Sequence, residues 1–168
     1  MKSILYSLIC LILSSTVISA CAQNGKPSPA TTTTGKVGNA TITINYGAPS
    51  VKGRKIWGEL VPYGKVWRTG ANDATTIKID QDVLIEGKSL PKGEYALFTI
   101  PEVKEWTIIF SKNAKQWGAY SYKQEDDALR VNVKPTASSS LTETLKFEVT
   151  GGKVILKWEN AEVGFKVN

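Results

Sequence analysis

Alternation of apolar and polar residues with a period of two is the feature of this chain that most restricts its fold. Ile42, Ile44 and Tyr46 alternate with polar residues, and residues 145–149 and 153–158 repeat the pattern. Successive side chains of a β-strand point to opposite faces of a sheet, so each of these segments has one face suited to a core and one suited to water. The pattern predicts strands that are buried on one side.

Short segments with glycine separate the alternating segments, at residues 86–88, 91–94 and 151–152. A two-glycine turn between two alternating segments is typical of a tight β-hairpin. We count about ten short strands and no helical stretch of more than two turns. Strands without crossover helices predict an all-β fold, in the form of a single antiparallel β-sandwich or jelly-roll-like domain.

The composition excludes several kinds of chemistry. The chain has 168 residues and no histidine, and its two cysteines, Cys10 and Cys21, lie near the N-terminus. It therefore lacks the residues for a Ser-His-Asp or Cys-His pair, a zinc or iron–sulfur site, or a disulfide framework. The acidic clusters at residues 80–82 and 125–127 lack the length and glycine placement of a calcium loop. We predict no catalytic residues, no metal site and no cofactor.

The first residues have the pattern of an export signal. A short basic segment at residues 1–3 precedes an uncharged apolar run at residues 4–18, which is shorter than the roughly 18–20 residues of a spanning helix. The string Ile18-Ser19-Ala20-Cys21 resembles the signal of bacterial lipoproteins, in which the cysteine is diacylated and becomes the new N-terminus. We predict a lipoprotein-type signal peptide over residues 1–20 and lipidation of Cys21, which would anchor the protein to a membrane.

Cleavage before Gln23, after an Ala-x-Ala site, is the alternative, and in both cases the mature protein works outside the cytoplasm. A lipoprotein would reside in the periplasm or at the outer membrane. Residues 21–38 are rich in Pro, Thr, Ser and Gly and contain few large apolar side chains. They predict a flexible tether, because burial cannot repay the entropy of ordering such a segment. Residues 39–168 remain as the folded domain.

Positive charge is concentrated in one part of the chain. Its formal net charge is +6. Between residues 35 and 72 a single acid, Glu59, accompanies six basic residues: Lys36, Lys52, Arg54, Lys55, Lys65 and Arg68. Such a concentration attracts anions if the groups lie close together in space. Because an exported protein rarely meets nucleic acid, we predict no nucleic-acid partner and instead a polar or anionic small molecule or glycan.

The basic segment is also the least strand-like part of the domain. Residues 47–76 contain many glycines and little sustained alternation, and long irregular segments of β domains are often functional loops. Arginines offer paired donors to an anion, and tryptophans can stack on a sugar ring. The predicted ligand-binding residues are Arg54, Trp57, Tyr63, Trp67, Arg68, Asn72 and Asp73. In the alternative interpretation, the tryptophans close an end of the sandwich and the arginines pair with carboxylates of the same protein.

Several strings of the chain together resemble one bacterial family. They are Ile42–Tyr46, Pro49–Arg54, Ile56-Trp57-Gly58, Leu60–Gly64, Val66-Trp67-Arg68-Thr69-Gly70-Ala71-Asn72, Tyr95–Pro101 and Trp117-Gly118. On these motifs the body of the chain, from about residue 40 to 158, resembles the family known only as domain of unknown function 2911. The resemblance implies an exported, often lipidated protein with a β-rich domain and no established reaction. Ala48 and Ser111 depart from the family pattern, which commonly has an arginine and an asparagine there.

Three functions stay open at this point. The first is binding of a polar or anionic envelope ligand, and the second is docking on another envelope protein through a contiguous apolar patch. The third is a carbohydrate-active enzyme, which needs two carboxyl groups about 5–9.5 Å apart and no histidine. Asp73 could supply one of these groups. For Asp127 we expect an ion pair with Arg130 at the start of a strand.

Overall fold

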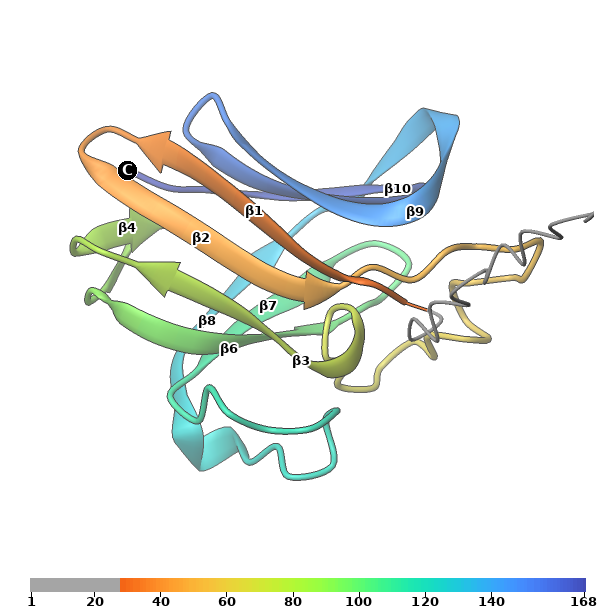
Figure 1. Ribbon diagram of the computed structural model, residues 1–168, viewed down its shortest axis with the longest axis horizontal. Coiled ribbons are helices and arrows are strands. Elements are labelled where there is room, and N and C mark those ends of the chain that lie inside the picture. Colours follow the sequence, from red (N-terminus) through yellow and green to blue (C-terminus); the bar gives the residue numbers. More distant parts are fainter. Residues whose placement is uncertain (1–27) are drawn as a thin grey trace, which may run out of the picture.

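Two antiparallel β-layers pack against each other (Figure 1). The computed structural model describes residues 28–168, so the predicted signal peptide and Cys21 lie outside the described residues. One layer is a six-stranded sheet in the order β1-β2-β3-β6-β7-β8, and the other contains the long hairpin of β9 and β10, with the small β4–β5 hairpin beside it. The elements are β1 (Ala30–Val37), β2 (Ala40–Gly47), β3 (Ala71–Ile79), β4 (Val83–Ile85), β5 (Lys88–Leu90), β6 (Gly93–Ile100), β7 (Trp106–Ser111), the 3₁₀ turn η1 (Gln124–Asp126), β8 (Asp127–Val133), β9 (Thr136–Thr150) and β10 (Lys153–Lys166).

This architecture confirms the predicted all-β antiparallel sandwich. The alternating residues face inward as expected, since Ile42 and Ile44 of β2 are fully buried, and Phe147 and Leu156 of the opposite layer are buried. Each such side chain contributes roughly 1.5–3 kcal/mol of burial free energy, so the interior between the layers supplies most of the stability. None of the helices within residues 28–168 has the length and apolar character needed to cross a membrane.

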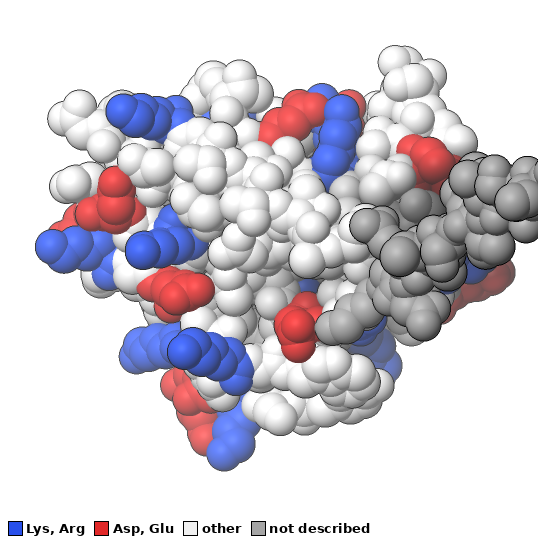
Figure 2. All heavy atoms as spheres, in the orientation of Figure 1, with Lys and Arg blue, Asp and Glu red and all other residues white. Residues whose placement is uncertain are grey.

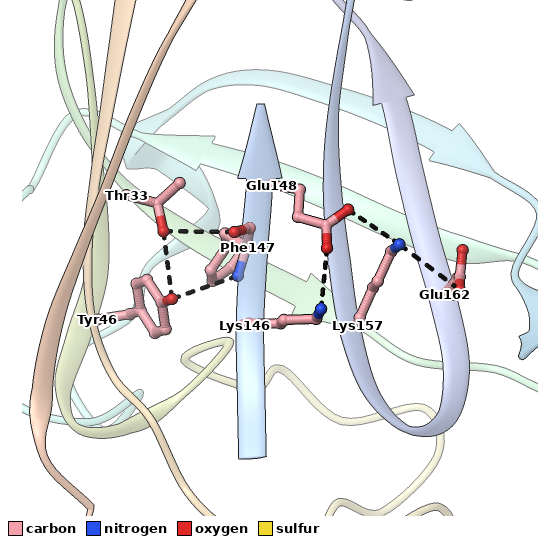
Figure 3. Close-up of polar contacts among 7 residues, drawn as sticks. All are labelled: Thr33, Tyr46, Lys146, Phe147, Glu148, Lys157 and Glu162. Carbon is pink, nitrogen blue, oxygen red and sulfur yellow. Dashed lines mark hydrogen bonds and ion pairs between the residues drawn. The ribbon is translucent and has the colours of Figure 1, made fainter. Parts of the chain in front are cut away.

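The first strand lies where the sequence predicted part of the tether. Residues 30–37 form β1 and pair with β2, so the predicted tether is wrong for this segment. Threonine suits a pleated strand although it adds little apolar surface. Thr33 faces the interior, where it donates a hydrogen bond of 3.3 Å to the Phe147 carbonyl and shares one of 3.2 Å with the Tyr46 hydroxyl (Figure 3). The hydrogen bond from Thr33 therefore helps to hold this edge strand against β9.

A charged network covers the outer face of the β9–β10 hairpin (Figure 3). The Glu148 carboxylate accepts from Lys157 at 2.9 Å and from Lys146 at 3.0 Å, and Lys157 also approaches Glu162 at 3.8 Å. The hydrogen bonds from Lys157 and Lys146 lower the pKa of Glu148. Because these groups face water, the network marks the solvent side of the hairpin and adds little to stability.

Two segments of backbone approach each other closely where β2 ends and β3 begins. A Cβ atom added at Gly47 would lie 2.3 Å from the Ala71 carbonyl oxygen. The register between β2 and β3 shifts at the same place, between Asn45 and Gly47. Only a residue without a side chain fits here, so the contact fixes where β3 starts.

We expect Gly47→Ala to destabilise the protein by at least about 1–3 kcal/mol, because the new methyl group must displace backbone rather than a flexible side chain. Gly164→Ala in β10 is the matched control, since its Cβ would meet Ile155 at an ordinary 3.4 Å. That change should be neutral or slightly stabilising. Chemical denaturation of both variants measures the effect, and equal midpoints would contradict the steric argument.

Candidate functional site

A segment between β7 and β8 covers part of the outer face of the six-stranded sheet (Figure 1). We call residues 112–126 the cap. Its Tyr122 packs edge-on against Phe98 at a centroid distance of 5.1 Å and lies over a second apolar cluster that includes Ile109. Outward-facing residues of β6 and β7 are apolar here, so the sheet needs a cover at this place and the cap provides it.

Polar contacts fasten the cap to β8. The Asp127 carboxylate accepts a hydrogen bond of 2.9 Å from the Tyr122 hydroxyl and pairs with the guanidinium of Arg130. Arg130 also donates to the Tyr122 oxygen. Burial and the hydrogen bond to Asp127 raise the pKa of Tyr122. The predicted pairing of Asp127 with Arg130 is therefore confirmed, and its role is to hold the cap in place.

The other end of the cap pairs with the start of β3. Asp73 and Trp117 face each other in an isolated antiparallel bridge. The Ala74 amide donates to the Gln116 carbonyl at 3.0 Å, and the Gly118 amide donates to the Asn72 carbonyl at 3.2 Å. These bonds flank the pair, so Asp73 and Trp117 occupy a non-hydrogen-bonded position, in which Cα atoms lie about 4.5 Å apart and side chains are closest. The bridge places a carboxylate beside an indole on one face.

Trp117 and Tyr120 form an exposed aromatic pair on the cap. Their rings stack at a centroid distance of 5.5 Å with an interplanar angle of 13°. Trp117 is 64% exposed and Tyr120 is 83% exposed. Large aromatic side chains usually bury most of their surface, so a stacked pair that stays in water has the character of a contact surface.

Two adjoining cavities of about 330 and 390 Å³ lie beside this pair. They share Asp73, Ala74 and Thr76 of β3, and we call them together the outer groove. Trp117 and Gln116 line one side of the groove and strands β1 and β2 line the other. The charged residues among its described lining are Asp73 and Lys115. The groove is thus a hollow of mixed polar and apolar lining with balanced charge, next to an aromatic surface.

A row of polar side chains crosses the groove from strand to strand. Thr32 of β1 donates a hydrogen bond of 2.8 Å to the Asn45 side-chain oxygen, and the Asn45 amide reaches the Thr76 hydroxyl at 3.5 Å. The three residues are direct neighbours in the register of β1, β2 and β3. Their hydroxyl and amide groups keep donor and acceptor capacity toward solvent, which is what a polyhydroxylated ligand requires.

Of the residues predicted to bind a ligand, Asn72 and Asp73 line the outer groove. Asn72 adopts a left-handed backbone conformation, with φ of 64°, which asparagine tolerates. Its amide donates to the Ser28 carbonyl at 3.1 Å, so it also ties the start of β1 to β3. The exposed Asp73 side chain is available to a ligand.

The predicted aromatic residues lie elsewhere. Trp57 and Tyr63 line a separate cavity at the end of the sandwich. Trp67 is only 9% exposed, and its ring stacks on Trp158 at 5.8 Å. A stacking role toward a ligand does not fit the position of Trp67, because the core already occupies its surroundings. The placement matches the alternative interpretation, in which tryptophans close an end of the sandwich.

Neither of the two predicted arginines lines the outer groove or the cavity that contains Trp57 and Tyr63. Arg54 donates to the carbonyl oxygens of Ser50 and Val51, so its guanidinium stabilises its own loop. The Arg68 Nε lies buried and has no hydrogen-bond partner among the residues described. Basic and acidic side chains are interspersed on the face shown in Figure 2, with no extended basic patch. The sequence surplus of positive charge is therefore not gathered on this face.

Sequence reasoning missed the two most exposed aromatic residues of the site, Trp117 and Tyr120. A signal was present, because residues 112–126 form a second irregular segment that is rich in aromatic residues. Its basic and acidic residues nearly balance, so the criterion of concentrated positive charge does not select it. Asn45 and Thr76 lie in regular strands, where their polarity indicates only a solvent-facing position.

Comparison with known proteins places the chain in a family. A family model described as a protein of unknown function, DUF2911, matches residues 28–167. The chain belongs to the DUF2911 family. The match spans both layers and the cap, so the outer groove lies wholly within the DUF2911 domain. No curated protein and no solved structure matches the chain.

We expect Asp127→Asn to loosen the cap of this DUF2911 domain. The change leaves Tyr122 and Arg130 without their charged partner and should cost about 1–3 kcal/mol, because these groups are partly buried. Hydrogen exchange over residues 112–126 should rise more than exchange in β2. Glu125→Gln is the control, since its pair with Lys123 is exposed and contributes little. Unchanged protection of the cap in Asp127→Asn would refute its fastening role.

Proposed function

We propose that this protein is an exported, lipid-anchored β-sandwich that binds a polar ligand of glycan type in the outer groove. The observation that carries the proposal is the bridge between Asp73 and Trp117, which sets a carboxylate beside an exposed indole. The C–H face of a sugar ring is apolar and its rim carries hydroxyl groups. An indole beside hydrogen-bonding side chains matches both properties at once.

The outer groove favours an uncharged, hydroxyl-rich ligand over an anion. Asp73 would repel an anionic group placed against Trp117, and Lys115 balances its charge within the lining. Asn45 and Thr76 add neutral donors and acceptors along the groove. The anionic ligand expected from the sequence relied on Arg54 and Arg68. The Arg54 guanidinium is engaged with backbone carbonyls, and Arg68 does not line the outer groove.

Hydrolysis of a glycan finds less support than binding. Two carboxyl groups have to face each other across the bond that is cleaved. Asp73 is the one carboxylate among the described residues that line the outer groove. Docking on a protein through an apolar patch also finds less support, because the polar side chains of Asn45, Asp73 and Thr76 interrupt the apolar surface of the groove.

Affinity electrophoresis of the full chain tests the glycan proposal. The gels contain a neutral polysaccharide, such as a β-glucan, xylan or mannan, or the anionic polysaccharide alginate. We expect retardation by at least one neutral polysaccharide and about tenfold weaker retention of Trp117→Ala, which corresponds to the loss of one aromatic contact of about 1.4 kcal/mol. Asp73→Asn should also weaken retention.

Leu141→Ala is the matched control, because Leu141 is an exposed apolar side chain in β9, outside the lining of the groove. Its retention should equal that of the unchanged chain. Equal retention of Trp117→Ala and the unchanged chain would rule out the outer groove as the binding site. Retardation by alginate alone would favour an anion-binding protein instead.

Lipid anchoring is a separate part of the proposal and rests on the N-terminal sequence. Residues 4–18 are apolar and uncharged, and Ile18-Ser19-Ala20 precedes Cys21. In bacteria fed an alkyne-labelled fatty acid, we expect the chain to carry the label and Cys21→Ser to lose it. Cys10→Ser should keep the label, because Cys10 lies inside the predicted signal peptide. Label on Cys21→Ser would show that the anchor lies elsewhere.

A further inference from the structure

A second cavity, of about 340 Å³, lies at the end of the sandwich and shares no lining residue with the outer groove. We call it the end pocket. It forms where the turn of residues 57–63, the β6–β7 connection and the bulged middle of β10 meet the start of β9. The lining residues that matter for its chemistry are Trp57, Tyr63, Glu102, Trp106 and Asn160.

Aromatic rings form one wall of the end pocket, and the core holds them in place. Trp57 contacts Trp106 at a centroid distance of 4.9 Å and an interplanar angle of 68°. Further edge contacts to Trp67 at 5.8 Å and Trp158 at 5.7 Å prevent rotation of its ring. Tyr63 is 39% exposed and lies over Gly58, where an added Cβ would be 3.1 Å from the Tyr63 ring. The wall is preorganised, so a ligand need not order it.

One carboxylate stands beside these rings. A Cβ at Gly64 would lie 3.1 Å from the Glu102 Oε1 atom, which places the carboxylate against the turn that carries Tyr63. The Gly64 amide donates to the Pro101 carbonyl at 3.0 Å and fixes the two turns together. Glu102 takes part in none of the ion pairs among residues 28–168. It is also the one charged residue in the described lining of the end pocket.

We propose that the end pocket binds a small organic cation through a quaternary ammonium group. The negative faces of aromatic rings attract such a cation by about 0.5–2 kcal/mol each, depending on its desolvation, and the Glu102 carboxylate supplies the opposite charge. The remaining lining combines Val103, Pro135 and two alanines with the neutral polar residues Thr136 and Asn160. The methyl groups of a quaternary ammonium group can pack against the aromatic rings, and such a group carries no N–H donors that need partners.

Asn160 and Thr136 also line the end pocket. The Thr136 hydroxyl donates to the Glu162 carbonyl at 3.2 Å, so its lone pairs remain for a ligand. A polar substituent on the cation, such as a hydroxyl group, could bond to these residues. The structure thus assigns to the end pocket a class of ligand with a methylated ammonium head and a short polar tail, of which choline is the simplest example.

Isothermal titration calorimetry of the full chain with choline tests the proposal. Its comparison ligand is 3,3-dimethylbutan-1-ol, which has the same shape but a carbon atom in place of the charged nitrogen. We expect choline to bind at least about tenfold more tightly than the neutral alcohol, because shape and apolar burial are shared and only the charge differs. Equal affinity for the two compounds, or no heat with choline, overturns the proposal.

Variants locate the binding site. Glu102→Gln and Tyr63→Leu should each weaken choline binding by about tenfold, since both side chains are exposed and the fold does not depend on them. Glu94→Gln and Tyr120→Leu are the matched controls on the six-stranded sheet and the cap, and they should bind choline normally. Choline affinity that is unchanged in Glu102→Gln and Tyr63→Leu overturns the assignment to the end pocket. Glu102→Gln and Tyr63→Leu should retain normal binding to glycans. The glycan proposal and the choline proposal are therefore tested independently.

Discussion

Contacts among four tryptophans anchor residues 48–70, the longest irregular segment within residues 28–168, to the core of the sandwich. Trp57 and Trp67 belong to that segment, Trp106 begins β7 and Trp158 lies in β10. Every pair among them except Trp106 and Trp158 has a ring contact between 4.9 and 6.4 Å. Large aromatic rings bury extensive apolar surface. The cluster therefore fixes a loop that has few backbone hydrogen bonds of regular secondary structure to hold it in place.

The tryptophan cluster also determines where β3 begins and where Asp73 lies. The backbone of Trp67 pairs with Thr99 of β6 through hydrogen bonds of 2.7 and 2.9 Å. This pairing fixes the position of the chain just before β3. Thr69 then takes a left-handed conformation, with φ of 56°, although it is β-branched and 1% exposed. Such strain persists only where neighbours over-determine it, and here Thr75 donates to the Thr69 carbonyl at 2.9 Å while the Thr69 hydroxyl lies 3.2 Å from that of Thr99. β3 starts directly afterwards, so Asp73 reaches the cap in one fixed register.

The same cluster separates the two proposed sites. On one side Trp57 forms a wall of the end pocket, and on the other the strained turn leads to the outer groove. Each hollow contains one carboxylate in its described lining, with aromatic rings beside it. The difference between them is chemical. Asp73 stands beside one exposed indole and the neutral side chains of Asn45 and Thr76, which suit a polyol, whereas Glu102 stands beside several aromatic rings, which suit a cation.

The sequence by itself determined the fold class and the pairing of Asp127 with Arg130, because strand alternation, glycine turns and near neighbours act over short stretches of chain. It did not determine β1, since a threonine-rich segment becomes a strand only when a distant edge such as β2 accepts its hydrogen bonds. Only the tertiary structure decided which aromatic residues are core and which are surface. Trp67 and Trp117 both follow irregular sequence, yet the first packs on Trp158 and the second pairs with Asp73. Those partners come from other strands, and burial depends on which distant segments meet rather than on the residues beside each tryptophan.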